Sequence, residues 1–242
     1  MNKNEKSRRI RERVRLTIPV RVRGRDSLDY EWTEISRLID VTPYGARFGL
    51  SRPTEPGRLL HVTLAMPRSM RCFDHVEDQY RVWSLVRNVR LLTPAESSTA
   101  PIEAGVAFVG KHPPASFLTD PSQRYDIHTQ GKSGLWTVRE DIQTDKRGAT
   151  RHTIPIEVSI EVFGTSDDSV VSEKTVTENI SRTGAAVFTS LNIERGRFVK
   201  ITSEYPPVSA IAAVRARRVG PDGIPRLHLK FVGSEWPLEG LE

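Results

Sequence analysis

The chain has little of what secreted or membrane proteins carry. It has one cysteine, Cys72, in 242 residues, so an internal disulfide is excluded and a reducing cytoplasm is favoured. No apolar run approaches the roughly 20 residues that span a bilayer. The basic N-terminus is not followed by the apolar stretch of a secretory signal. We therefore expect a cytoplasmic protein without membrane insertion.

The usual catalytic patterns are also missing. The six histidines have no metal-ligand spacing, and neither a His-Glu-x-x-His motif nor a nucleophile elbow occurs. Asp74-His75-x-Glu77-Asp78 is a compact acidic cluster, which we interpret as a solvated loop. Gly131-Lys-Ser resembles the end of a phosphate loop, but Asp126 stands where the earlier glycine is required. These absences predict a protein that is not an enzyme, with no catalytic residue, metal site or cofactor.

What the sequence does contain is a series of short alternating segments rich in β-branched residues, separated by polar turns. They predict an all-β fold of two six-stranded antiparallel barrels in tandem. The strands expected in the first half are 16–24, 30–39, 46–50, 58–66, 79–92 and 102–109. Those expected in the second half are 153–163, 171–180, 185–190, 197–203, 208–219 and 226–232.

The length of the chain fits two modules near the usual domain size. We expect an N-terminal domain with a basic arm over 1–110, a linker over 111–146 and a C-terminal domain over 147–242. The linker is rich in Pro and Gly, but its apolar side chains predict a short helix packed on the first barrel around 114–126. Trp236 is expected to pack on the second barrel.

The most informative feature is a pattern that occurs twice, which points to two copies of one module. Two arginines four residues apart are followed by an Asp/Asn-x-Ser/Thr-x-x-Gly turn. The segments that begin at Arg15 and Arg151 match at five of eight positions, which selects Arg11 and Arg15 over Arg9 and Arg13. The first copy is Arg11, Arg15, Asp40, Thr42 and Gly45, and the second is Arg147, Arg151, Asn179, Ser181 and Gly184.

These residue types suit an anionic, guanine-like ligand. A guanidinium binds phosphate oxygens, grips the O6/N7 edge of guanine or stacks on a purine. The oxygens of Asp40 and Asn179 accept hydrogen bonds from the opposite edge of guanine, and Thr42 and Ser181 add hydroxyl groups. The glycines permit either a positive-φ turn or a close backbone approach. Either half of the pattern alone is common, since Asn-x-Ser-x-x-Gly also reads as an ordinary strand-to-turn sequence.

In these motifs the chain resembles two PilZ domains in tandem, a family whose members with both elements bind the bacterial second messenger cyclic di-GMP. The resemblance implies that Arg11, Arg15, Arg147 and Arg151 bind phosphates and guanine edges. It implies that Asp40, Thr42, Asn179 and Ser181 line a guanine pocket. Because the arginine pairs lie in the terminal arm and at the end of the linker, we expect a receptor that repositions its arm or its barrels on binding and signals to a downstream protein, which is unidentified.

The two copies depart from the family pattern in different ways. The first has Thr42 in place of serine, followed by Pro43, which stiffens the turn. The second keeps Asn-x-Ser-x-x-Gly, but His228 stands where the first copy has Gly105. We expect the second site to be the more intact of the two.

Two other functions are compatible with the sequence. Residues 1–25 hold ten Lys/Arg and two Glu, a local charge of +8 in a chain of net +6, which is typical of an arm that meets phosphates. Nucleic-acid binding through this arm is therefore one alternative, although no aromatic cluster for base stacking accompanies it. A ligand-free interaction scaffold is the other.

Overall fold

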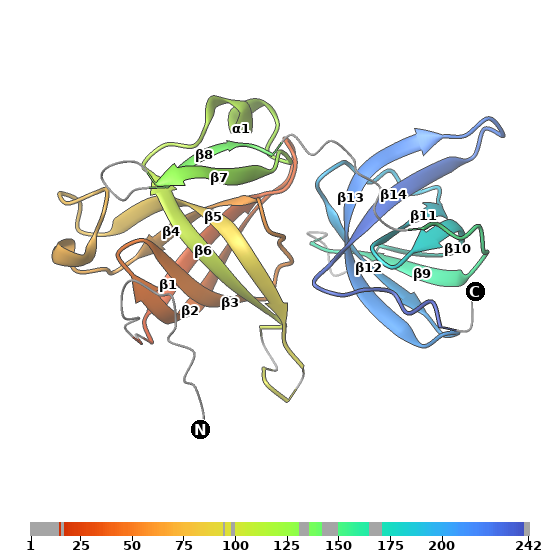
Figure 1. Cartoon of the computed structure of the whole chain (residues 1–242), viewed down its shortest axis with the longest axis horizontal. Coiled ribbons are helices and arrows are strands. Elements are labelled where there is room, and N and C mark those ends of the chain that lie inside the picture. The colour runs from red at the N-terminus through yellow and green to blue at the C-terminus, as the bar shows by residue number, and fades with distance from the viewer. Residues whose placement is uncertain are drawn as a thin grey trace, which may run out of the picture.

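The computed structural model describes residues 15, 17–93, 95–97, 100–130, 136–141, 150–164 and 171–239. Two β-barrels lie side by side along the long axis of the molecule (Figure 1). Each is a closed antiparallel barrel of six strands, with the orders β1-β2-β3-β6-β5-β4 and β9-β10-β11-β14-β13-β12. The predicted fold class is confirmed.

The strands of the first barrel are β1 (Pro19–Arg25), β2 (Glu31–Thr42), β3 (Gly45–Leu50), β4 (Leu59–Leu64), β5 (Tyr80–Leu91) and β6 (Ile102–Gly110), with a 3-10 turn at Arg68–Met70. Those of the second barrel are β9 (Glu157–Val162), β10 (Ser172–Ser181), β11 (Gly184–Phe188), β12 (Phe198–Ser203), β13 (Val208–Val219) and β14 (Pro225–Val232). Each of the twelve overlaps a strand that alternation predicted, because inward apolar residues repeat every second position.

Each barrel has its own apolar core. Val20, Val22 and Phe48 are completely buried in the first, and Ile160 and Ile201 are completely buried in the second. Burial of this kind contributes roughly 25 cal/mol for each Å² of apolar surface removed from water.

The C-terminal segment closes the second core, as predicted. Trp236 is completely buried and stacks on Phe231 with ring centroids 5.4 Å apart. Trp236, beyond the end of β14, is therefore part of the core of the second barrel.

The segment between the barrels packs on the first barrel. It carries α1 (Ala115–Thr119), which confirms the predicted short helix, and a hairpin of β7 (Tyr125–Gln130) and β8 (Trp136–Glu140), which was not expected. Phe117 is buried with Tyr125 against strands β4 and β5, whereas the adjacent Leu118 is 60% exposed. The division into domains at 1–110, 111–146 and 147–242 remains our proposal.

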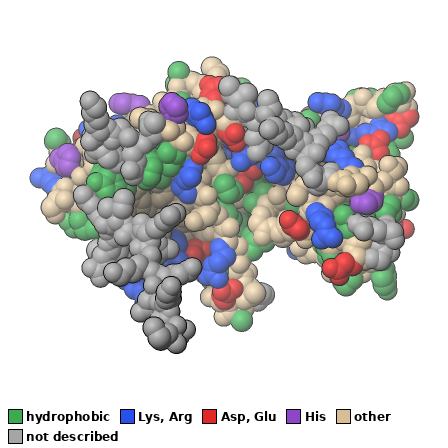
Figure 2. Space-filling view, in the orientation of Figure 1, with side chains coloured by type: hydrophobic (Ala, Val, Ile, Leu, Met, Phe, Trp, Pro, Cys, Tyr) green, Lys and Arg blue, Asp and Glu red, His purple; other side chains and the backbone are tan. Residues whose placement is uncertain are grey.

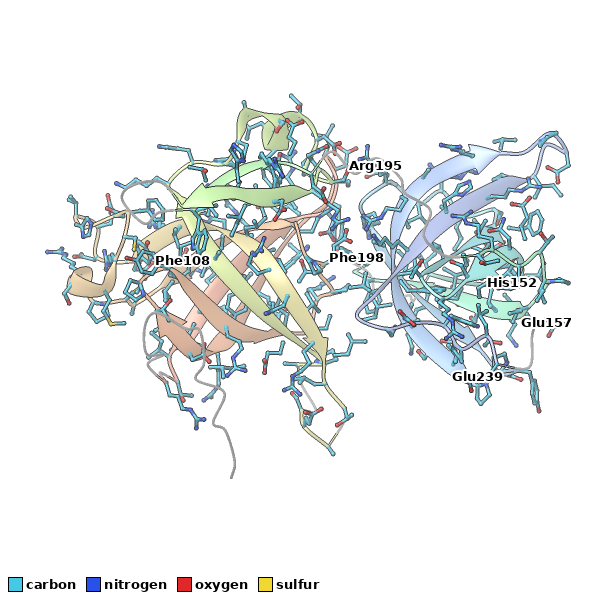
Figure 3. All side chains as sticks on the ribbon, viewed as in Figure 1. Phe108, His152, Glu157, Arg195, Phe198 and Glu239 are labelled. Carbon is cyan, nitrogen blue, oxygen red and sulfur yellow. The ribbon has the colours of Figure 1, made fainter. Side chains whose placement is uncertain are left out.

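The two barrels also contact each other through buried arginines. Arg58, on the first barrel, is 3% exposed and donates hydrogen bonds to the carbonyls of Asp26 and Ser122, both at 3.0 Å. Its guanidinium also lies 5.9 Å from the ring of Phe198, on the side of the second barrel that faces the first (Figure 3). This arginine fixes the two barrels and the intervening segment to one another.

Two further contacts cross the same boundary. The guanidinium of Arg197 stacks at 3.5 Å over the ring of Tyr30, and Arg215 pairs with Glu55 through two hydrogen bonds of 2.8 and 2.5 Å. Gly196 makes the approach close enough, since a Cβ there would lie 2.2 Å from the carbonyl oxygen of Asp26. Figure 2 shows basic and acidic side chains mixed along this boundary.

Candidate ligand-binding sites

The motif turn of the first barrel joins β2 to β3. Thr42 pairs with Gly45, and the Thr42 hydroxyl accepts a hydrogen bond from the Tyr44 amide at 3.2 Å. Gly45 does not have a positive φ. A Cβ at this glycine would instead lie 2.3 Å from the carbonyl oxygen of Val106 on β6. Of the two reasons for glycine that the sequence left open, close backbone approach is the right one here.

In the first barrel the candidate acceptor already has a partner. Asp40 lies opposite Arg47, and its Oδ2 accepts from Arg47 Nε at 2.9 Å and from Nη2 at 2.7 Å. Arg47 Nη1 continues to Glu103 at 2.9 Å. Burial lowers the pKa of Arg47, but its hydrogen bonds and charge interactions with the two carboxylates outweigh this and raise the pKa. The negative charge of Asp40 is therefore already compensated by Arg47, a residue of the same barrel.

A cavity of about 230 Å³ lies over this motif. It is lined by motif residues and by Arg87, Asn88, Gly105 and Trp136, the last of which comes from β8 of the intervening hairpin. Arg87 also pairs with Asp126 of β7 at 2.8 Å. The volume is below the roughly 300–1,000 Å³ of typical small-molecule pockets. The structure thus brings Asp40, Thr42 and Gly45 together, but in a confined space.

The motif turn of the second barrel, between β10 and β11, has the same backbone. Ser181 pairs with Gly184, and its hydroxyl donates to the Gly184 carbonyl at 3.1 Å. A Cβ at Gly184 would lie 2.3 Å from the carbonyl oxygen of Leu229. The serine hydroxyl therefore closes the turn, as the strand-to-turn interpretation of this sequence predicts, while the glycine again permits close packing.

The second acceptor is joined to the arginine half of its motif. Asn179 Oδ1 accepts a hydrogen bond from Arg151 Nη1 at 3.3 Å. His152, the residue after Arg151, forms an antiparallel bridge with Ile180 through hydrogen bonds of 2.8 and 2.9 Å. Because His152, labelled in Figure 3, is bonded to Ile180 of β10, the bridge holds the adjacent Arg151 beside the end of this strand. Two halves of the motif that are 28 residues apart in sequence are thus in contact.

The neighbours of Asn179 differ from those of Asp40. Across the sheet, Asn179 pairs with Ala186, which pairs with His228, which pairs with Ala216. Ala186 occupies the place that Arg47 has in the first barrel, so no guanidinium from the sheet competes for the amide of Asn179. His228, at the position of Gly105, is half-buried.

The remaining arginines of the motif divide into two groups. Arg11 and Arg147 lie outside the described residues. Arg15 is described and exposed, and Asp40 is held by Arg47. Among the described residues, a motif arginine therefore contacts its own polar turn in the second copy, through Arg151 and Asn179.

Other parts of the chain behave as structural elements. The compact acidic cluster forms a loop, as predicted, in which His75, Glu77 and Asp78 are exposed. Asp74 is not solvated, however, because it is 4% exposed, accepts the backbone amide of Val76 at 3.2 Å and pairs with Lys111 at 3.3 Å. Within the described ranges, no three His, Cys, Asp or Glu side chains gather as a metal site. In the same part of the chain, no helix is long and apolar enough to cross a membrane.

Comparison with known proteins gave no matching family model and no matching curated protein. Among solved structures, the chain is similar to the inhibitor of motility MotI/DgrA of Bacillus subtilis, with 13% identity and a TM-score of 0.32 over 91% of this chain and 90% of that one. It is similar to YcgR from Escherichia coli in complex with c-di-GMP, with 11% identity and a TM-score of 0.29 over 89% and 76%. It is also similar to the MrkH–c-di-GMP complex of K. pneumonia, with 8% identity and a TM-score of 0.29 over 92% and 82%.

With TM-scores of 0.29 to 0.32, these likenesses are too weak to assign a ligand to this chain. In its doubled motif and its two barrels the chain resembles proteins with two PilZ domains in tandem.

Proposed function

We propose that this chain is a non-enzymatic receptor for cyclic di-GMP and that the second barrel carries its principal site. The single observation that supports this most is the hydrogen bond of 3.3 Å between Arg151 and Asn179. It brings the cationic half of the motif to its polar turn, so that both halves lie within reach of one guanine nucleotide.

The chemistry of the proposed site follows from its donors and acceptors. Arg151 has further N–H groups for the O6/N7 edge of guanine or for a phosphate oxygen. The carboxamide of Asn179 faces the N1–H and N2–H₂ edge, where its oxygen accepts. Arg147, four residues before Arg151, would supply a second guanidinium, while Ser181 and Gly184 shape the turn.

The half-buried imidazole of His228 gives the proposed site one further group. It lies in the same cross-strand row as Asn179, with Ala186 between them. A planar ring at this place suits stacking on a purine. We therefore include His228 in the proposed site, although the family pattern at this position differs.

We assign the first barrel a weaker, secondary role in binding. The residues proposed to bind the ligand there are Arg11, Arg15, Asp40, Thr42 and Gly45. A guanine that approached Asp40 would have to displace Arg47, whose loss would leave Glu103 without its 2.9 Å partner. Such an exchange costs free energy before any binding energy is gained.

Titration calorimetry with cyclic di-GMP tests the proposal. Arg151→Ala should weaken binding by about 10- to 100-fold, because hydrogen bonds to charged groups contribute about 1.5–3 kcal/mol. Arg15→Ala, at the equivalent position, should have a smaller effect. Arg81→Ala, which removes an exposed arginine on the outer surface of β5, is the charge-matched control and should bind like the wild type.

A wild-type chain that binds no cyclic di-GMP would overturn the proposed function. Equal losses for Arg15→Ala and Arg151→Ala would instead show that both barrels bind. We expect the proposed receptor to signal through a downstream protein that distinguishes the bound from the free state.

A further inference from the structure

One lysine of the second barrel borders the motif turn but belongs to neither half of the motif. Lys230, on β14, pairs with Gly184 of β11 on one side and with Ala213 of β13 on the other. Its chain neighbours Leu229 and Phe231 point into the core, so Lys230 points outward, on the same face as His228. Neither cross-strand neighbour has a polar side chain for its ammonium group.

The charged neighbours of Lys230 are residues at the boundary between the barrels. Arg215 and Arg124 are the cations that act on it, and Glu55 and Asp141 are the carboxylates. Each carboxylate already pairs with an arginine, Glu55 with Arg215 at 2.5 Å and Asp141 with Arg124 at 3.6 Å. Among the residues that the structure describes, no carboxylate lies within ion-pair distance of Lys230.

The pKa of Lys230 reflects this excess of positive charge. Burial lowers it, and Arg124 and Arg215 lower it further, while the opposing effects of Glu55 and Asp141 do not restore it. A half-buried ammonium group in a positive field is stabilised by any anion that approaches it.

We infer that Lys230 is a phosphate-binding residue of the second site, placed to hold a phosphate group of the ligand whose base lies against Asn179. This inference rests on the proposed function, because it adds a residue to the same site. Gly184 and Lys230 form one cross-strand row, and Asn179, Ala186 and His228 form the row next to it. Rows two residues apart along a strand are separated by about 7 Å, and β10 and β14 are two strand spacings, about 10 Å, apart. The Cα atoms of Asn179 and Lys230 are therefore separated by about 12 Å along the sheet. An extended lysine side chain and a nucleotide together span this distance.

The first barrel has alanine where the second has Lys230. Gly45, which corresponds to Gly184, pairs with Ala107 on β6, and Ala107 pairs with Leu85 on β5. The place of the lysine is thus taken by a methyl group. Lys230 therefore distinguishes the two sites as well as extending one of them.

The test compares Lys230→Met with Lys200→Met in titrations with cyclic di-GMP. Methionine keeps a flexible stem but removes the charge, and Lys200 is a 45%-exposed lysine on β12 of the same barrel. We expect Lys230→Met to weaken binding by about 10-fold, the lower range for a hydrogen bond to a charged group. Lys200→Met should match the wild type, and Lys230→Arg should restore most of the affinity.

If the wild type binds, Arg151→Ala weakens binding as expected and Lys230→Met binds normally, the role of Lys230 is overturned while the receptor function stands. A second measurement does not depend on cyclic di-GMP. Acetylation of lysines, followed by peptide mass spectrometry, should show that inorganic pyrophosphate protects Lys230 but not Lys200. Protection in a chain that binds no cyclic di-GMP would refute the proposed function and retain the phosphate site, whereas equal labelling with and without pyrophosphate would refute the phosphate site.

Discussion

The two barrels share a motif, but the residues that lie beside its acceptor, Asp40 or Asn179, on the neighbouring strands are different. We call the acceptor and these cross-strand neighbours the acceptor row. In the first barrel the row is Asp40, Arg47, Gly105 and Asn88, and in the second it is Asn179, Ala186, His228 and Ala216. Large and small side chains have changed places along the row. A motif fixes where an acceptor lies, but its cross-strand neighbours decide whether a ligand can use it.

A second pair of corresponding residues gives the same lesson. Arg87 and Arg215 occupy the same β-bulge in β5 and β13. Each meets a carboxylate from another element, Asp126 in the hairpin and Glu55 in the opposite barrel. The first pair is exposed, whereas the side chain of Glu55 is 4% exposed. Arginines at equivalent positions therefore have different roles: Arg87 holds the hairpin on the first barrel, and Arg215 joins the two barrels.

The largest expected effect comes from neutralising these two arginines. Arg215→Met should lower the free energy of unfolding by about 3–5 kcal/mol, because it leaves the buried carboxylate of Glu55 uncompensated. Arg87→Met should cost about 0–1 kcal/mol, since an exposed ion pair is screened by water. Urea denaturation of the two variants measures the difference. Equal costs would show that the boundary between the barrels is not a buried electrostatic contact.

The sequence could predict the strands and the turns but not these partners. The strands were predictable because inward apolar residues alternate, and the turns because the motif places a glycine after two connecting residues. Arg47 comes seven positions after Asp40, and only the register of β2 and β3, with its bulge after Leu38, brings them together. Glu55 and Arg215 are 160 residues apart, a contact that no local pattern encodes.

The hairpin was missed for a related reason. Tyr125–Gln130 and Trp136–Glu140 are short and mostly polar on one face, and they lie beside a Gly-rich stretch that is typical of linkers. Their apolar members, Ile127 and Val138, find a partner only on the outer surface of the first barrel. Tertiary packing, rather than local propensity, makes these segments strands.

The second-largest expected effect is on binding, and it comes from a substitution that makes the cross-strand neighbours of Asn179 resemble those of Asp40. Ala186→Arg places a guanidinium opposite Asn179, where it competes with Arg151 and with the ligand for the amide oxygen. We expect cyclic di-GMP binding to weaken by about 2 kcal/mol, roughly 30-fold. Calorimetry measures this change, and circular dichroism checks that the barrel remains folded.

The reciprocal change is the matched control for this swap. The double variant Asp40→Asn, Arg47→Ala gives the first barrel the acceptor and the neighbour of the second, while Glu103 keeps its contact with Arg90 at 3.3 Å. If the row determines access, the double variant should bind more ligand per chain than the wild type. If the double variant binds with unchanged stoichiometry and Ala186→Arg binds like the wild type, the cross-strand neighbours of the acceptor do not determine ligand access.

The smallest expected effect is on how stability depends on pH. It distinguishes two buried carboxylates of the first barrel, Asp26 and Glu55, which lie near the second barrel. Burial raises the pKa of Asp26 above its usual value of 3.8, and Arg58 and Trp32 only partly oppose this. Burial also acts to raise the pKa of Glu55, but Arg215 outweighs it and leaves that pKa below the usual value of 4.5. The two groups must therefore change stability in opposite directions with pH.

Glu55 contributes stability that is present above pH 4.5 and is lost as the pH falls through its lowered pKa. Asp26 contributes stability at acidic pH that is lost as the pH rises from 3.8 through its raised pKa. Denaturation curves from pH 3 to pH 7 should thus show Glu55→Gln losing stability relative to the wild type as the pH rises, and Asp26→Asn gaining it. Slopes of the same sign would mean that Arg58 compensates Asp26 as fully as Arg215 compensates Glu55, and the boundary would then hold two equivalent ion pairs instead of one.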